Sequence, residues 1–283
     1  MSLQPLGDEY LMTEPPLKVF LIKTPANNRG LKLINDLASD QFVNLQIFEA
    51  IMIDSAETLS KSDVLVRGEV FEAYTGRGLS YPEIGCAASH NGIRHLISRL
   101  DIGAVVFEDD AAIINLDNFH RVCADFLKTY NNEAAVLSLT LPTKFTRRHR
   151  DTVAPRLIKL FGPTPLAAAY AITPLAAARL YKSNSEITYV ADWPNADVNF
   201  FCLTSPLATH NQDDSSSTID PSNSLKRSQS SISRRVQILF CIDYVLHARK
   251  YISFRDYIAY HFKKPFLYYL DVSRIKIFLA LGI

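Results

Sequence analysis

Short runs of β-branched and aromatic residues alternate with helix signals from Lys18 to Leu207, and this alternation restricts the possible folds more than any other feature of the sequence. Strands that alternate with helices usually pair in parallel, so we predict an α/β domain built on a mixed, mainly parallel central sheet. The predicted strands are Lys18–Lys23, Phe42–Met52, Ala104–Phe107, Ala135–Leu139, Leu166–Ile172 and Asn199–Leu207, and the predicted helices include Arg29–Ala38.

Two further helices have well-marked starts. Ser80 and Glu83 have the spacing of a capping box, and Pro82 lies in the first turn, where its missing N–H costs little. Thr173 can cap an Ala-rich helix that begins at Pro174. These signals predict where the helices begin.

Three consecutive carboxylates, Glu108, Asp109 and Asp110, directly follow the predicted strand Ala104–Phe107. They repel one another, so a cation should compensate them. The carboxyl ends of strands in an open α/β sheet face the ligand crevice. Oxygen ligands suit Mg²⁺ or Mn²⁺, which bridge carboxylates to substrate phosphates. We therefore predict a metal-assisted ligand site here, the alternative being a solvated acidic turn that caps the next helix.

The segment Glu83–His90 (EIGCAASH) contains small residues that allow a helix to approach another backbone closely. By itself, His90 is more typical of a hydrogen-bonded structural histidine than of a catalyst. Glu83 is likewise explained by its capping box without any function.

Taken together with VVFEDD about twenty residues later, this segment resembles the signature pair of glycosyltransferase family 25. That family comprises the lipooligosaccharide (LPS) galactosyltransferases of Gram-negative bacteria and the related collagen galactosyltransferases. Further blocks follow in the family's order over about Lys18 to Ile219: KVFLIK, FEAIMID at Phe48–Asp54, GPTPLAAAYAIT, VADW at Val190–Trp193 and SPLATHNQDDSSSTI at Ser205–Ile219.

The resemblance implies a GT-A-type nucleotide-binding fold, a UDP-sugar donor with galactose as the expected hexose, a Mn²⁺ or Mg²⁺ cofactor, and inversion at the anomeric carbon. It also implies the site residues. Asp110, Glu108 and His210 are the expected metal group, with Glu108 reaching the ribose or a metal-bound water. The expected donor-binding residues are Lys23, Arg29, Asp54, Glu108, Asp109 and His90, and the expected general base is Asp192 or Asp197.

Other interpretations of these residues remain open. Asp192 could instead be the N-cap of a helix that starts at Trp193. Lys23 and Arg29 could be a solvated strand end and helix start. The first strand also departs from the family's usual Ile-Asn-Leu run, and Arg29 is followed by Gly30 where the family has a second arginine. This departure favours the alternative function, a non-catalytic carbohydrate-binding or scaffold protein on the same fold.

The net charge of +1 hides two regions of opposite sign. Residues 225–283 contain 11 basic and 3 acidic residues, a net charge of +8, and the preceding residues carry 19 basic and 26 acidic residues, a net charge of −7. Basic residues interleaved with aromatic ones at helical spacing suggest amphipathic helices on an anionic membrane surface, nucleic acid, or packing on the acidic body. We predict a 1–17 extension, an 18–224 glycosyltransferase domain and a 225–283 helical tail.

The four cysteines are far apart and form no CxxC pair, which favours a reducing compartment. Acidic residues precede any apolar run at the N-terminus, and no stretch approaches the roughly 20 apolar residues of a spanning helix. We therefore expect a cytoplasmic enzyme, peripheral on the inner membrane, that transfers a hexose to an LPS core acceptor. Nucleic acid is not an expected partner.

Overall fold

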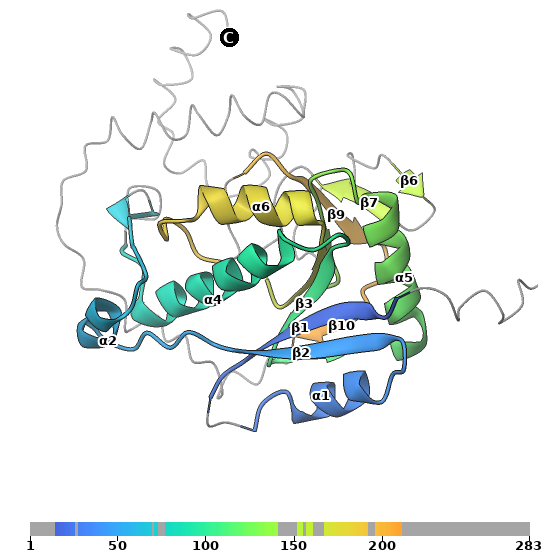
Figure 1. Cartoon of the computed structure of the whole chain (residues 1–283), viewed down its shortest axis with the longest axis horizontal. Helices are drawn as coiled ribbons and strands as arrows, with labels where there is room; N and C mark the ends of the chain where they lie inside the picture. Colours follow the sequence, from blue (N-terminus) through green and yellow to red (C-terminus); the bar gives the residue numbers. More distant parts are fainter. Residues whose placement is uncertain are drawn as a thin grey trace, which may run out of the picture. The chain divides into compact units, whose positions relative to one another are not determined.

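The computed structural model describes residues 15–25, 28–69, 71–72, 77–140, 152–154, 157–160, 167–191 and 196–210, all of which belong to one compact unit. The whole predicted tail, 225–283, and residues 1–14 of the predicted extension lie outside the described residues. The described part is a central sheet covered by helices on both faces (Figure 1).

The central sheet has eight strands in the order β2-β1-β3-β8-β5-β9-β7-β6. Six of them point the same way, whereas β8 and β7 run antiparallel to their neighbours. The sheet is therefore mixed and mainly parallel, as predicted. Its strands are β1 Leu17–Lys23, β2 Val43–Glu49, β3 Ala104–Glu108, β5 Ala135–Ser138, β6 Thr152–Ala154, β7 Leu157–Leu160, β8 Ala169–Ile172 and β9 Asn199–Leu203.

A second, two-stranded sheet pairs β4 (Ala111–Ile113) with β10 (Ala208–His210) in antiparallel fashion. The register places His210 opposite Ala111, the residue that follows the acidic triad. A residue that lies a hundred positions along the chain from Asp110 is thus fixed beside it.

Alternation along the inner strands divides the core into two layers. In β1, Val19 and Leu21 face a layer that contains α1 and α5, whereas Phe20 and Ile22 face a layer that contains α4 and α6. Parallel strands with both faces covered are continuously apolar, which is why they were recognisable in the sequence. The helices are α1 Leu31–Ala38, α2 Ala56–Lys61, α4 Tyr81–Ile97, α5 Leu116–Thr129 and α6 Pro174–Ser183.

The predicted helix starts at Ser80 and Thr173 are confirmed. The Ser80 side chain accepts a hydrogen bond from the Glu83 backbone, and the Glu83 side chain accepts one from the Ser80 backbone, which completes the capping box. Thr173 caps α6 by accepting from the Ala176 backbone. No helix within the described ranges is long and apolar enough to cross a membrane.

Several predicted elements need correction. Two strands are shorter than predicted: β2 ends at Glu49, and β9 ends at Leu203, before Pro206 interrupts the backbone donors. The predicted strand from Leu166 begins only at Ala169. Helix α5 was not predicted, although Asn115 caps it through its side chain.

Candidate functional site

The ends of β1 and β3 form a topological switch point. From β1 the chain crosses to β2 on one side, and it then returns to β3 on the other side of β1. In open α/β sheets, ligands bind outside the carboxyl ends of strands at such a point. Lys23 and Glu108, the last residues of β1 and β3, flank it, so the acidic triad lies where the fold favours a ligand.

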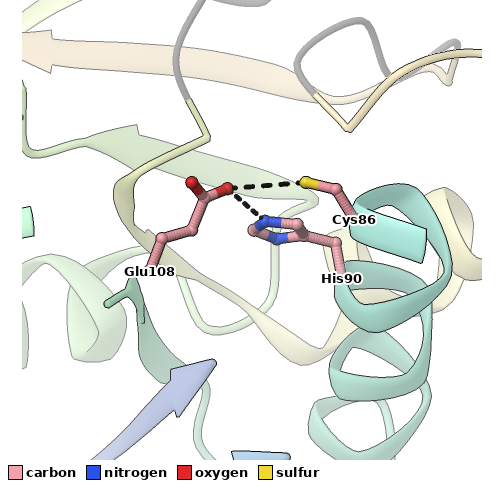
Figure 2. A group of neighbouring side chains, drawn as sticks. All are labelled: Cys86, His90 and Glu108. Atoms are coloured by element: carbon pink, nitrogen blue, oxygen red, sulfur yellow. Dashed lines mark hydrogen bonds and ion pairs between the residues drawn. The ribbon is translucent and has the colours of Figure 1, made fainter. Parts of the chain in front are cut away.

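Alternation in β3 determines where Glu108 points. Phe107 belongs to the α1 and α5 layer, and Val106 to the α4 layer, so Glu108 is directed towards α4. There it meets Cys86 and His90, which lie four residues apart on one face of α4. Figure 2 shows the three side chains converging from the helix and the strand end.

Helix α4 approaches this edge closely because of its small residues. A Cβ at Gly85 would lie 2.5 Å from the backbone oxygen of Ile51, so a larger residue would push the helix away. Ser89 accepts a 2.8 Å hydrogen bond from the Ile51 backbone and donates one to the Gly85 carbonyl. The close approach predicted for the small residues is confirmed, and it places His90 against the sheet.

His90 links Glu108 to Tyr170 of β8. Its Nε2 is hydrogen-bonded to Glu108 Oε1 at 2.7 Å, and its Nδ1 to the Tyr170 hydroxyl at 2.9 Å. The thiol of Cys86 donates a longer hydrogen bond, 3.8 Å, to the same Glu108 oxygen. Burial raises the pKa of Glu108, but hydrogen bonds and electrostatic interactions with its neighbours, chiefly His90, outweigh burial, so the pKa is lowered overall. Glu108 is therefore ionised at neutral pH.

Asp109 is the buried anchor of the triad. Its Oδ2 accepts a 2.9 Å hydrogen bond from the Thr24 backbone, and its Oδ1 lies 3.4 Å from Arg29 Nε. Gly30, whose φ is +76°, lies so close that an added Cβ would be 3.2 Å from Asp109 Cβ. Glycine suits this position because of its left-handed backbone. Asp109 thus holds the turn after β1 against the end of β3.

Asp110 is compensated only in part. Its Oδ2 accepts hydrogen bonds from Arg29 Nη2 at 2.8 Å and is bonded to His210 Nε2 at 3.0 Å. Burial and the negative charges of Glu108 and Asp109 raise the pKa of Asp110, while His210 and Arg29 lower it less strongly. The pKa is raised overall, chiefly by burial.

Two buried atoms of this cluster have unused hydrogen-bonding capacity. Asp110 Oδ1 and His210 Nδ1 are buried and have no hydrogen-bond partner within the described part of the chain. A carboxylate oxygen and an imidazole nitrogen are both ligands of Mn²⁺, and a cation would supply the missing charge. Glu108 lies close enough to affect the pKa of Asp110 and to be affected by His210. The three residues therefore lie near one another, and their role as a metal group stays a prediction.

The other predicted site residues are placed as follows. Lys23 donates to the Thr24 carbonyl at the switch point. Asp54 is exposed and accepts from Thr58 in the first turn of α2, an arrangement that lowers the pKa of Asp54. Asp197 is 66% exposed and lies 3.6 Å from Arg179 of α6. Asp192 lies outside the described residues.

Comparison with known protein families identifies the family to which this chain belongs. The family model of glycosyltransferase family 25, described as LPS biosynthesis protein, matches residues 17–194, more than half of the chain. The chain belongs to glycosyltransferase family 25. A comparison with curated proteins gives no match.

For this family 25 member, glycosyl transfer in lipopolysaccharide biosynthesis is the supported reaction class, with a nucleotide sugar as donor and an LPS acceptor. Sequence reasoning had not assigned Cys86 or Tyr170 to the site. The four-residue spacing of Cys86 and His90 was a usable signal. Tyr170 had none, because its position depends on the antiparallel register that sets it opposite Val106.

Proposed function

We propose that this protein is a metal-dependent, inverting glycosyltransferase that moves galactose from UDP-galactose to an LPS core acceptor. The observation that carries the proposal is the half-buried group of Glu108, Asp110 and His210 at the switch point of the sheet. The proposed domain, 18–224, is of the GT-A type, and the mixed sheet with carboxylates at the end of β3 supports that assignment.

Asp110, Glu108 and His210 are the residues that would hold Mn²⁺ or Mg²⁺. When bound, the metal supplies positive charge to the diphosphate as it leaves. The chain's own residues provide the setting: His90 orients Glu108, and Arg29 holds Asp110 in place. An ionised Glu108 with its second oxygen turned away from His90 can bind the ribose or a metal-bound water.

Donor binding is proposed for the residues around the turn after β1. Lys23 and Arg29 lie beside the triad and offer positive charge to phosphate oxygens. Asp109 supports them by holding Arg29 and the Thr24 backbone. Asp54 is proposed for the uridine side of the donor.

Inversion requires a base on the face of the sugar opposite the diphosphate, to take the proton of the acceptor hydroxyl. We propose Asp192 for this role on the basis of the VADW block. Asp197 is the alternative, and its exposed carboxylate paired with Arg179 describes a surface ion pair more than a base.

The location of the enzyme is proposed from charge. The 225–283 tail, with its net charge of +8, would hold the enzyme on the cytoplasmic face of the inner membrane. Each Lys or Arg near an anionic leaflet contributes about 1 kcal/mol, so a few suffice for loose attachment. An LPS acceptor anchored in that leaflet would then be within reach. Removal of residues 225–283 should lower recovery in the membrane fraction.

The deciding experiment measures transfer and hydrolysis with a panel of nucleotide sugars, in the presence of Mn²⁺ and after chelation. We expect turnover of UDP-galactose that chelation abolishes, and a loss of roughly 100-fold or more in Asp110→Asn. Asp36→Asn is the matched control, because Asp36 pairs with Lys32 on the surface of α1. Its activity should equal that of the wild type.

Two outcomes would count against this function. Full metal-dependent activity in a folded Asp110→Asn variant would refute the metal assignment. Calorimetry that detects no UDP binding in the presence of Mn²⁺ would favour the alternative, a non-catalytic carbohydrate-binding or scaffold protein.

A further inference from the structure

We infer that Cys86, His90 and Glu108 form a second cation site, suited to a thiophilic divalent ion such as Zn²⁺, that shares Glu108 with the proposed Asp110 site. The three side chains offer a thiolate sulfur, an imidazole nitrogen and a carboxylate oxygen, all within 4.8 Å of one another (Figure 2). This set of donors is typical of Zn²⁺, whereas Mn²⁺ and Mg²⁺ prefer oxygen.

The present distances lie close to those of a coordinated ion. A tetrahedral Zn²⁺ with ordinary bond lengths of about 2.0–2.3 Å separates a nitrogen and an oxygen ligand by about 3.4 Å, and a sulfur and an oxygen ligand by about 3.6 Å. The corresponding separations here are 2.7 Å for His90 and Glu108, and 3.8 Å for Cys86 and Glu108. Small side-chain movements are therefore enough to admit the ion.

Tyr170 provides the outer partner that a metal-bound histidine needs. A coordinating imidazole usually donates its second N–H to an oxygen, which fixes the tautomer. The Tyr170 hydroxyl lies 2.9 Å from His90 Nδ1 and can accept a hydrogen bond from it. On ion binding, the proton that Glu108 accepts from His90 Nε2 can therefore move to Nδ1, which leaves the Nε2 lone pair for the ion.

The backbone already fixes two of the ligands. Cys86 and His90 lie one turn apart on α4, which Gly85 and Ser89 lock against residue Ile51. His90 is fully buried, but the Glu108 side chain is 24% exposed, so an ion and a water ligand can reach the group. The site needs no rearrangement of the fold.

Protons balance simply on binding. Cys86 loses its thiol proton to solvent, and the S–H bond to Glu108 is replaced by bonds from sulfur and oxygen to the ion. Neutral His90 moves its single proton from Nε2, where Glu108 accepts it, to Nδ1, where the Tyr170 hydroxyl accepts it. Each bound ion therefore releases one proton, that of the Cys86 thiol.

Occupation of this site would oppose the proposed transferase reaction, because Glu108 belongs to both groups. An ion held by Cys86, His90 and Glu108 would neutralise the negative charge that Glu108 otherwise offers to the Asp110 site. We therefore expect Zn²⁺ to inhibit an enzyme that Mn²⁺ activates, with inhibition that depends on Cys86.

Cobalt is the probe for the test, because a thiolate bound to Co²⁺ gives a charge-transfer absorption that oxygen and nitrogen ligands do not. The reduced full-length protein is titrated with Co²⁺ and then with Zn²⁺. We expect one equivalent of thiolate-bound Co²⁺, displaced by Zn²⁺ and retained in excess Mn²⁺. Cys86→Ser and Cys86→Ala should both lose the absorption, while Cys202→Ala and Cys241→Ser keep it.

The Tyr170→Phe variant tests Tyr170 as the hydrogen-bond partner of His90. The affinity of this variant for Co²⁺ should fall by about 10-fold, and the charge-transfer absorption should be retained. Thermal unfolding of each variant checks its fold. Absence of the absorption in the wild type, or its persistence in a folded Cys86 variant, would overturn the inference. Asp110→Asn should keep the absorption even where transfer is lost, so failure of the proposed function and failure of this site give different results.

Discussion

Glu83 is a buried carboxylate and Asp110 a half-buried one in the same α/β domain, and their surroundings differ. Both Glu83 oxygens accept hydrogen bonds from Arg77, at 2.6 and 2.7 Å, and one also accepts from the Ser80 backbone at 2.8 Å. Burial raises the pKa of Glu83, but these hydrogen bonds lower it by more than burial raises it, so the pKa is lowered overall. Asp110 Oδ1 has no hydrogen-bond partner among the described residues, and the pKa of Asp110 is raised.

The difference separates a carboxylate that stabilises the fold from one that we propose binds a cation. Glu83 completes a helix cap, and both of its oxygens already accept hydrogen bonds. Asp110 is held by Arg29 and His210 on one oxygen, while its other oxygen lies buried beside Glu108 and remains uncompensated. A carboxylate with a raised pKa persists in a folded protein where the rest of the structure holds it in place. Such carboxylates are typical of sites that bind charged ligands. Within the triad, Asp109 belongs with Glu83, because both of its oxygens are engaged.

The largest effect should come from removing the satisfied carboxylates. Glu83→Ala and Asp109→Ala should each lower the free energy of unfolding by about 2–4 kcal/mol, because each leaves an arginine and a backbone N–H without their acceptor. Chemical denaturation measures this loss. The free energy of unfolding of Asp110→Asn should fall by much less than this, or should rise.

Equal losses in all three variants would contradict the distinction between the two kinds of carboxylate. Lys61→Ala provides a surface reference, because Lys61 and Glu57 form an exposed ion pair on α2. Its effect should be within about 0.5 kcal/mol.

A smaller effect should come from the cation itself. Mn²⁺ at a concentration 100-fold above its dissociation constant should raise the free energy of unfolding of the wild type by about 2.7 kcal/mol, since it binds the folded state alone. Denaturation with Mn²⁺ and with chelator measures the gain. Glu83→Gln should keep it and Asp110→Asn should lose it, whereas an equal gain in both variants would place the ion elsewhere.

The role of Glu83 was easier to predict from the sequence than the surroundings of Asp110. The Ser80 and Glu83 capping box is local, so spacing alone identified it, and the apolar strands followed from their burial on both faces. The partners of the triad are not local: Arg29 lies 81 residues from Asp110, and His210 lies 100 residues away.

Those long-range contacts depend on registers that no short pattern encodes. The pairing of β10 with β4 fixes His210, and the antiparallel insertion of β8 between β3 and β5 fixes Tyr170. The position of the acidic triad at a strand end was predictable from the hydrophobic pattern. The pattern could not show which of the three carboxylates would be compensated, because that depends on which side chains the tertiary fold brings to each oxygen.

The smallest expected effect is also the most specific, since the two kinds of carboxylate should give opposite dependences on pH. A lowered folded pKa means that Glu83 adds stability above the unfolded carboxyl pKa of about 4.3, and this contribution is lost as pH falls through the folded value. A raised folded pKa means that ionised Asp110 costs stability, and the cost grows as pH rises from about 3.9 through the folded value.

Unfolding free energies of wild type, Glu83→Gln and Asp110→Asn, measured with chelator between about pH 3 and pH 7, compare the two slopes. The deficit of Glu83→Gln should widen as pH rises, while Asp110→Asn should improve relative to the wild type. Each unit of pKa difference contributes about 1.4 kcal/mol, which sets the scale of both changes. Slopes of the same sign would mean that Asp110 is already compensated by Arg29 and His210, and the charge argument for a cation at this edge would fail.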